Sequence, residues 1–236
     1  MAAVPSNAPP DAPDRSSPSS ASSPSSARRN NILSLVVLAL LAGVLWGTRP
    51  ASTGRSVPAN VAQTRGCISN LNRIAAAMAQ YAQDYDGKFP RGVDAEDRHQ
   101  PRNWLVRRAD GKWEDARHLP MLHDLLFPYL RDRTVWRCPA DIGWDKVRPP
   151  NQSSLRHVKP SSYARFGTSY FYLTEHGFVG WRAVDIEHPD RDVVLFDGDV
   201  WHQTEGLPSI NVLFADGHAQ NMTPQRFDHL FRNSIG

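Results

Sequence analysis

Hydrophobic residues recur along one stretch of the chain, residues 67–90, with the spacing of an α-helix. Successive apolar positions are three or four residues apart, which places them on one helix face: Ile68, Leu71, Ile74, Met78, Tyr81 and Tyr85. Asp86-Gly87 and Phe89-Pro90 then mark the end of the helix. A helix with a single apolar face must pack against another element, so we expect later segments of the chain to cover it.

The later segments carry shorter apolar runs that are typical of β-strands. Strands are expected at residues 134–138, 169–173, 193–196, 210–214 and 219–222. Asp-Gly pairs at 110–111 and 216–217 fit tight turns, the first of them within a hairpin at residues 103–115. Short helices are expected at residues 119–130 and 224–231, whereas residues 140–165 carry no clear pattern. A helix followed by antiparallel strands is an α+β fold.

The chain ahead of the long helix divides into a tail, an apolar segment and a linker. Residues 1–29 are rich in Ser, Pro and Ala and are predicted to be a disordered cytoplasmic tail. Residues 30–48 carry no charge and are long enough to cross a membrane as one helix, and Arg28-Arg29 ahead of them favour a cytoplasmic N-terminus. Residues 49–66 then link this anchor to an extracytoplasmic domain at residues 67–236. The alternative is a cleaved signal peptide followed by a secreted binding module.

Composition and motifs argue against several classes of function. The net charge is +3 without a dense basic block, so nucleic acid is not an expected partner. The sequence holds no recognisable nucleophile motif and no Gly-rich phosphate loop, so no enzymatic activity is expected. The two cysteines, Cys67 and Cys138, form no CxxC motif. Outside the cytoplasm they are predicted to form a disulfide, with two free thiols as the alternative.

One group of polar residues near the C-terminus is a candidate metal site. It follows two of the expected strands and comprises Asp197, Asp199, His202, Asp216 and His218. Carboxylate oxygens suit Ca²⁺, and oxygen mixed with imidazole nitrogen suits other divalent metals. The simpler interpretation is that these residues occupy solvent-exposed Asp-Gly turns. Apart from such an ion, no cofactor is expected.

Several segments, in this order, resemble bacterial prepilin-type and pseudopilin proteins. They are the helix at 67–90, PYLRDRTVWRCPAD at 128–141, TSYFYL at 168–173 and INVLFADGHAQ at 210–220. The C-terminal region of that group carries a His, nine intervening residues and Asp-Gly. The resemblance implies a long N-terminal helix packed on a small antiparallel sheet. It also implies a structural subunit or accessory of a type IV pilus-like or type II secretion-like envelope assembly, without catalysis.

Three features of the chain depart from that group. No Gly followed by Phe-Thr-Leu-x-Glu precedes the apolar segment, residues 30–48 contain no carboxylate, and Gly206 stands where the histidine would be, with His202 the nearest one. We therefore expect a single-pass protein of the bacterial inner membrane that is neither processed nor polymerised by the usual route. Its expected partners are the membrane and other pilin-like or secretion-system subunits. The alternative is a metal-binding extracytoplasmic module or hydrolase that uses the residues between Asp197 and His218.

Overall fold

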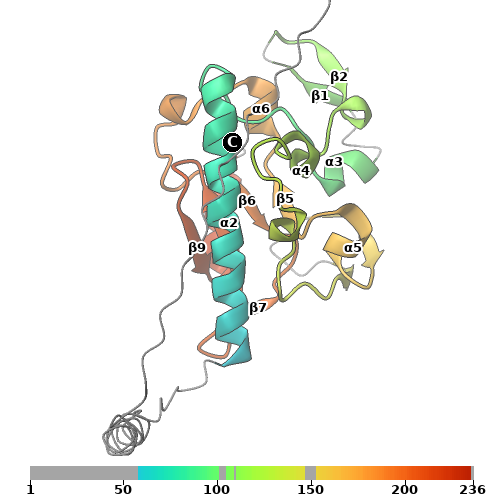
Figure 1. Cartoon of the computed structure of the whole chain (residues 1–236), viewed down its shortest axis with the longest axis vertical. Helices are drawn as coiled ribbons and strands as arrows, with labels where there is room; N and C mark the ends of the chain where they lie inside the picture. Colours follow the sequence, from blue (N-terminus) through green and yellow to red (C-terminus); the bar gives the residue numbers. More distant parts are fainter. Residues whose placement is uncertain (1–57, 101–104, 109, 147–152, 235–236) are drawn as a thin grey trace, which may run out of the picture. The chain divides into compact units, whose positions relative to one another are not determined.

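A long helix, α2 (Ala59–Asp84), lies against an antiparallel β-sheet in the folded part of the chain (Figure 1). The computed structural model describes residues 58–100, 105–108, 110–146 and 153–234, so the predicted tail and membrane segment at 1–48 lie outside the described residues. None of the helices in these ranges is both long and apolar enough to span a membrane. Residues 59–66, which the sequence assigned to a linker, are helical, because α2 begins at Ala59 rather than at Cys67.

One face of α2 is buried, and it largely matches the predicted apolar stripe. The buried residues are Thr64, Cys67, Leu71, Ile74, Ala77, Met78 and Tyr81. Fully burying a Leu or Ile side chain stabilises a fold by about 1.5–3 kcal/mol, so this face accounts for much of the attachment of the helix to the sheet. Tyr85 departs from the prediction, because it is half exposed and stacks on Tyr81. Asp86 and Gly87, with φ of 57° and 78°, end the helix as expected.

The sheet is entirely antiparallel, as the sequence predicted. Its strands are β5 (Tyr170–Tyr172), β6 (Val193–Asp197), β7 (His202–Thr204), β8 (Leu207–Phe214) and β9 (Ala219–Met222). β8 pairs with β6, β7 and β9, and β5 pairs with β6. The described domain is therefore α+β with a small antiparallel sheet.

Both faces of the sheet are covered. Val194 and Leu213 belong to the core cluster that contains the buried face of α2. Val212 and Phe214 belong to a second cluster with Phe227 of helix α7 (Pro224–Ser234). A sheet with cores on both faces gives β6 and β8 continuous apolar runs in place of alternating ones.

Smaller elements complete the described domain. The hairpin of β1 (Leu105–Arg107) and β2 (Trp113–Asp115) around Asp110-Gly111 confirms the prediction, and the helix expected at 119–130 is present only as α4 (Leu122–Leu125). Other short helices in the described residues are α3 (Ala95–His99), α6 (Glu175–Val179) and the 3₁₀ turns Ala116–His118 and Ala183–Asp185.

Two segments differ from the prediction. Residues 134–138 were expected to be a strand, but residues Arg133–Trp136 form a 3₁₀ turn because the Asp132 carboxylate accepts hydrogen bonds from the Thr134 amide and hydroxyl. Residues 140–165, which showed no pattern, contain the hairpin strands β3 (Trp144–Lys146) and β4 (Arg156–Val158) and helix α5 (Ser162–Phe166).

Candidate functional site

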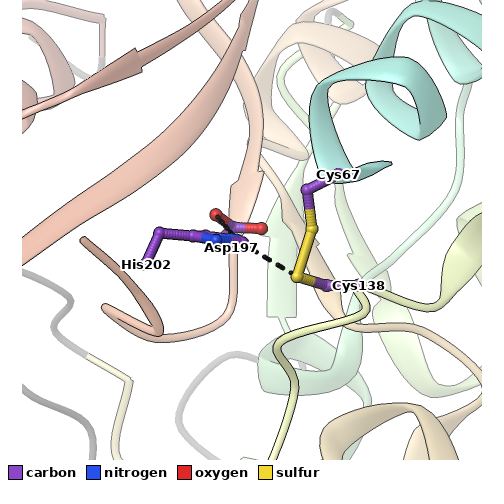
Figure 2. A group of neighbouring side chains, drawn as sticks. All are labelled: Cys67, Cys138, Asp197 and His202. Atoms are coloured by element: carbon purple, nitrogen blue, oxygen red, sulfur yellow. Dashed lines mark hydrogen bonds and ion pairs between the residues drawn. A yellow bond between two sulfur atoms is a disulfide. The ribbon is translucent and has the colours of Figure 1, made fainter. Parts of the chain in front are cut away.

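Four side chains that can ligate a metal meet beneath the N-terminal half of α2 (Figure 2). Cys67 comes from α2, Cys138 from the loop after residues Arg133–Trp136, Asp197 from the end of β6 and His202 from the start of β7. One ligand atom from each residue lies within 4.8 Å of the ligand atoms of the other three. All four residues are at most 2% exposed. The fold thus gathers two sulfurs, an imidazole and a carboxyl in one buried place.

The two cysteines are joined by a disulfide, which agrees with the predicted pairing. Their Cα atoms are 5.1 Å apart, and they are separated by 71 positions in the sequence. This close approach of α2 to the loop depends on Gly66, since a Cβ there would lie 3.1 Å from Cγ of Pro139. A bond that closes a loop of this size restricts the unfolded chain by about 4 kcal/mol on the loop-entropy model.

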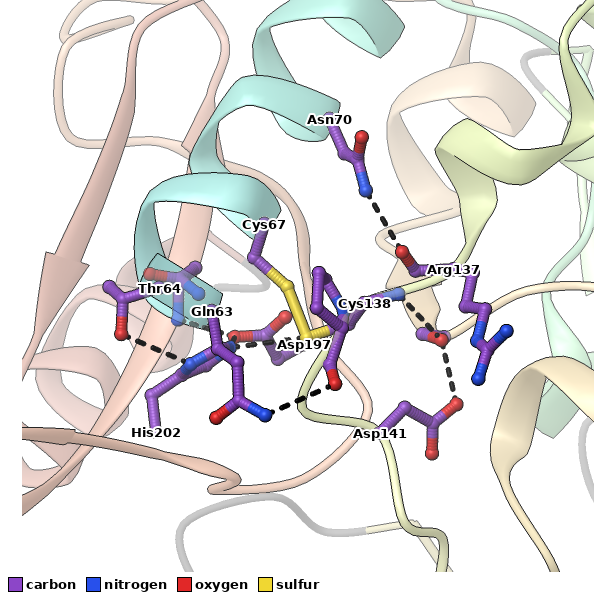
Figure 3. The surroundings of a disulfide bond; sticks show 12 residues. Gln63, Thr64, Cys67, Asn70, Arg137, Cys138, Asp141, Asp197 and His202 are labelled. Atoms are coloured by element: carbon purple, nitrogen blue, oxygen red, sulfur yellow. Dashed lines mark hydrogen bonds and ion pairs between the residues drawn. A yellow bond between two sulfur atoms is a disulfide. The ribbon is translucent and has the colours of Figure 1, made fainter. Parts of the chain in front are cut away.

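Hydrogen bonds fix the backbone of Cys138 (Figure 3). Its amide donates to Oγ of Ser169 at 3.0 Å, and the Ser169 hydroxyl donates to Oδ2 of Asp141 at 2.7 Å. The same carboxylate accepts from the amides of Gly143, Ser162 and Tyr163. Asp141 therefore ties the first turn of α5 to the position of Cys138.

Both nitrogens of the His202 ring have polar neighbours. Nδ1 of His202 lies 3.2 Å from Oγ1 of Thr64, and Nε2 lies 3.2 Å from Sγ of Cys138 and 3.4 Å from Oδ2 of Asp197. Burial lowers the pKa of His202 to about 4, so its ring is neutral at physiological pH.

Asp197 is a buried carboxyl with one unsatisfied oxygen. Its Oδ2 accepts a hydrogen bond from the Asn211 amide at 2.7 Å, whereas Oδ1 is buried and has no hydrogen-bond partner among the described residues. Burial raises the pKa of Asp197 to about 8. At neutral pH the carboxyl is therefore protonated beside a neutral imidazole, and its contact with His202 is not an ion pair.

The other predicted metal ligands do not join this cluster. In the antiparallel register Val193 of β6 pairs with Phe214, and Phe196 pairs with Val212, so Asp197 and Asp216 lie at opposite ends of the strand pair. There the exposed His218 and Asp216 contact each other at 2.6 Å between Nδ1 and Oδ1. Of the five predicted ligands, the structure therefore brings Asp197 and His202 together and leaves Asp216 and His218 at the other end of the strand pair.

The interpretation as exposed turns does not hold for three residues of this set. Asp197, Asp199 and His202 are at most 2% exposed, because they follow a strand that is covered on both faces. Another histidine, His176, is fully buried as well, with its Nε2 atom 2.6 Å from Oδ1 of Asp192.

From the sequence, the two cysteines were expected to form a disulfide or to remain free thiols, and were not predicted to be metal ligands. No local spacing relates them to Asp197 or His202, because the four residues come from four separate segments. The available signal was the apolar run directly before Asp197, which placed this carboxyl at the end of a core strand.

Comparisons with known proteins do not assign the chain to a family. A scan against protein-family models, a search of curated proteins and a search of solved structures each found no match. Function is therefore inferred below from the residues and their geometry.

Proposed function

We propose that this chain is a membrane-tethered structural or accessory component of the bacterial cell envelope, built on the pattern of pilin-type subunits and without catalytic activity. The observation that carries the proposal is the packing of α2 on the sheet. Its 26 residues extend over about 39 Å, and one stripe of them packs on the antiparallel sheet. This is the architecture that the resemblance to prepilin-type proteins implies.

The burial of the reactive groups supports a structural role. Cys67, Cys138, Asp197 and His202 are at most 2% exposed, so a substrate cannot reach them without opening the fold. Catalytic groups instead lie within reach of a bound substrate, commonly in a concave pocket.

The exposed pair Asp216 and His218 also fits a structural turn. The Asp216 carboxylate accepts a hydrogen bond from the His218 amide at 3.0 Å, which is the ordinary geometry of an Asp-Gly turn. The His218 ring stacks on Phe214 with 4.5 Å between ring centroids. These contacts occupy both side chains and account for the pair without a metal ion.

Membrane fractionation of the full chain tests the tether. We expect the protein in the membrane pellet after carbonate washing, and we expect residues 58–234 to be digested by protease added to spheroplasts. The matched control lacks residues 30–48 and should be recovered in the soluble fraction. Full-length protein recovered without detergent in the soluble fraction would overturn the tethered role.

Chemical crosslinking in the same membranes tests the partners. We expect adducts from a photoreactive residue placed at Asn72, on the exposed face of α2, with pilin-like or secretion-system subunits. The same group at the exposed Glu187 serves as the control. Equal labelling from both positions, or none from Asn72, would contradict an assembly role for this helix.

A further inference from the structure

The hydrogen bonds of Thr64 determine which nitrogen of His202 carries the ring proton. The Thr64 hydroxyl has one hydrogen, and it donates that hydrogen to the Asn60 carbonyl oxygen at 2.9 Å. The Thr64 oxygen can therefore only accept a hydrogen bond from Nδ1 of His202, which lies 3.2 Å away. It follows that Nδ1 is the nitrogen that carries the ring proton. Nε2 is left with a free lone pair, which is the form in which histidine binds metals.

This lone pair faces two atoms that can ligate a metal once the disulfide is reduced and Asp197 is ionised. Nε2 lies 3.2 Å from Sγ of Cys138 and 3.4 Å from Oδ2 of Asp197 (Figure 2). Oδ1 of Asp197 is buried and has no hydrogen-bond partner in the described part of the chain. A buried polar atom without a partner costs about 1–3 kcal/mol, and a cation placed among these atoms would offset that cost.

We infer that Cys67, Cys138, Asp197 and His202 bind one Zn²⁺ ion when the disulfide is reduced. Two thiolates, an imidazole and a carboxylate are four ligands of the kinds that zinc takes in tetrahedral sites. Ca²⁺ fits poorly, because it takes about six to eight oxygen ligands and this cluster supplies only those of Asp197.

The distances allow the ion to enter with small movements. Zinc binds sulfur at about 2.3 Å and nitrogen or oxygen at about 2.0–2.2 Å, so ligand atoms in a tetrahedral site are roughly 3.3–3.8 Å apart. The four ligand atoms already lie within 4.8 Å of one another. The Cys67 and Cys138 Cα atoms, 5.1 Å apart, place both sulfurs at the same centre. The ligand atoms are therefore close to the separations of a tetrahedral site, apart from the two sulfurs, whose bond must break first.

The groups around the ligands supply the support that structural zinc sites use. The Thr64 hydroxyl orients the His202 ring, and the Asn211 amide donates to Asp197. The Tyr170 hydroxyl lies 3.6 Å from Sγ of Cys67, where it can donate to a thiolate. All four ligands are closed off from solvent, which fits a structural site and not a catalytic one with an open position.

Electrons and protons balance in two successive steps, reduction of the disulfide and binding of zinc. A dithiol reductant transfers two electrons and two protons to the Cys67–Cys138 bond, so that the S–S bond breaks, two thiols form and the dithiol becomes a disulfide. Zn²⁺ then replaces the two thiol protons and the proton of the Asp197 carboxyl, and all three pass to solvent. The same residues thus hold α2 to the Cys138 loop by a disulfide under oxidising conditions and by a zinc ion under reducing conditions.

Zinc content of the full chain tests the inference. Detergent-purified protein is reduced with a phosphine under anaerobic conditions, incubated with zinc and desalted, and bound metal is measured by mass spectrometry. We expect about one zinc per chain after reduction and none in the oxidised protein. His202→Ala and Asp197→Asn should each weaken zinc binding at least tenfold, whereas His218→Ala should leave it unchanged.

Cobalt gives a second readout that does not depend on those variants folding. In the reduced wild-type chain Co²⁺ should give a thiolate charge-transfer band and the intense visible bands of a tetrahedral site. Thr64→Val removes the acceptor for the Nδ1 proton and should weaken cobalt binding, whereas Thr64→Ser should retain it.

Three results would each overturn the inference. They are an octahedral cobalt spectrum, a reduced wild-type chain that binds no more zinc than Cys67→Ala/Cys138→Ala, and a reduced chain that unfolds and stays unfolded with zinc present. None of them bears on the membrane tether, which is tested separately by fractionation.

Discussion

At the scale of single residues, two carboxyls at the start of α3 retain protons that they would release in water. Asp94 caps the helix by accepting from the Asp97 amide at 3.0 Å, and it also accepts from the Tyr172 amide at 3.2 Å. Burial raises the pKa of Asp94 well above its usual value and raises the pKa of Asp97 to about 7. Oδ2 of Asp97 is buried without a hydrogen-bond partner among the described residues.

The raised pKa of Asp97 predicts a stability that falls as pH rises. The folded state holds this proton more tightly than the unfolded state, so its contribution is complete below about pH 4 and is lost as pH rises through about 7. The unfolding free energy of the wild-type protein should fall between pH 5 and pH 8. In Asp97→Asn we expect this fall to be smaller by roughly 1–3 kcal/mol in urea titrations. Asp86→Asn, at a carboxyl that is 90% exposed, is the control. Equal pH dependence in wild type and Asp97→Asn would contradict the assignment.

The buried cluster shows which part of a site a sequence pattern can reveal. Asp197 and His202 stood out because a carboxyl and an imidazole follow an apolar run within a few residues. Their two neighbours, Cys67 and Cys138, lie 64 or more positions before His202 in the sequence. No short sequence motif therefore links the cysteines to Asp197 and His202. Only the packing of α2 on the sheet brings these groups together.

At the scale of elements, helices and strands with regularly spaced apolar residues were predicted well from the sequence. Elements without such regular spacing were not. The stripe of α2 and strands β6 and β8 have the apolar regularity that burial imposes. The hairpin of β3 and β4 has no such signal, because each strand has three residues and buries only one of them, Trp144 in β3 and Val158 in β4. The 3₁₀ turn at residues Arg133–Trp136 depends on one carboxylate, that of Asp132.

Two isoleucines on α2 test the orientation of this helix. Both belong to the apolar stripe in the sequence, but Ile74 is fully buried and Ile68 is partly exposed. We expect Ile74→Ala to lower the unfolding free energy by about 2–5 kcal/mol, because it leaves a cavity in the core between α2 and the sheet. Ile68→Ala should cost less than half as much. Equal losses in denaturant titrations of the two variants would mean that the helix faces the sheet differently.

At the scale of the whole molecule, the disulfide connects the start of the domain to its middle. The double variant Cys67→Ala/Cys138→Ala frees the 71-position loop in the unfolded state. We expect it to lower the unfolding free energy of the oxidised, metal-free protein by about 2–4 kcal/mol, seen as a lower urea midpoint. Met78→Leu, a nearly volume-conserving change on the same helix, should cost less than about 1.5 kcal/mol. An unchanged midpoint in the double variant would contradict a stabilising role for the bond.

The position of this bond near the start of α2 also determines how the domain responds to a pulling force. A load applied through the chain before residue 58 can unravel only residues 59–66 before it reaches Cys67. From there the covalent bond carries the load directly to Cys138, so the intervening residues bear no tension. A stretched chain spans at most about 3.3–3.6 Å per residue, so roughly 250 Å of contour length stays hidden for as long as the bond is intact. Under oxidising conditions the segment between Cys67 and Cys138 cannot extend under load, whereas reduction of the bond allows it to extend.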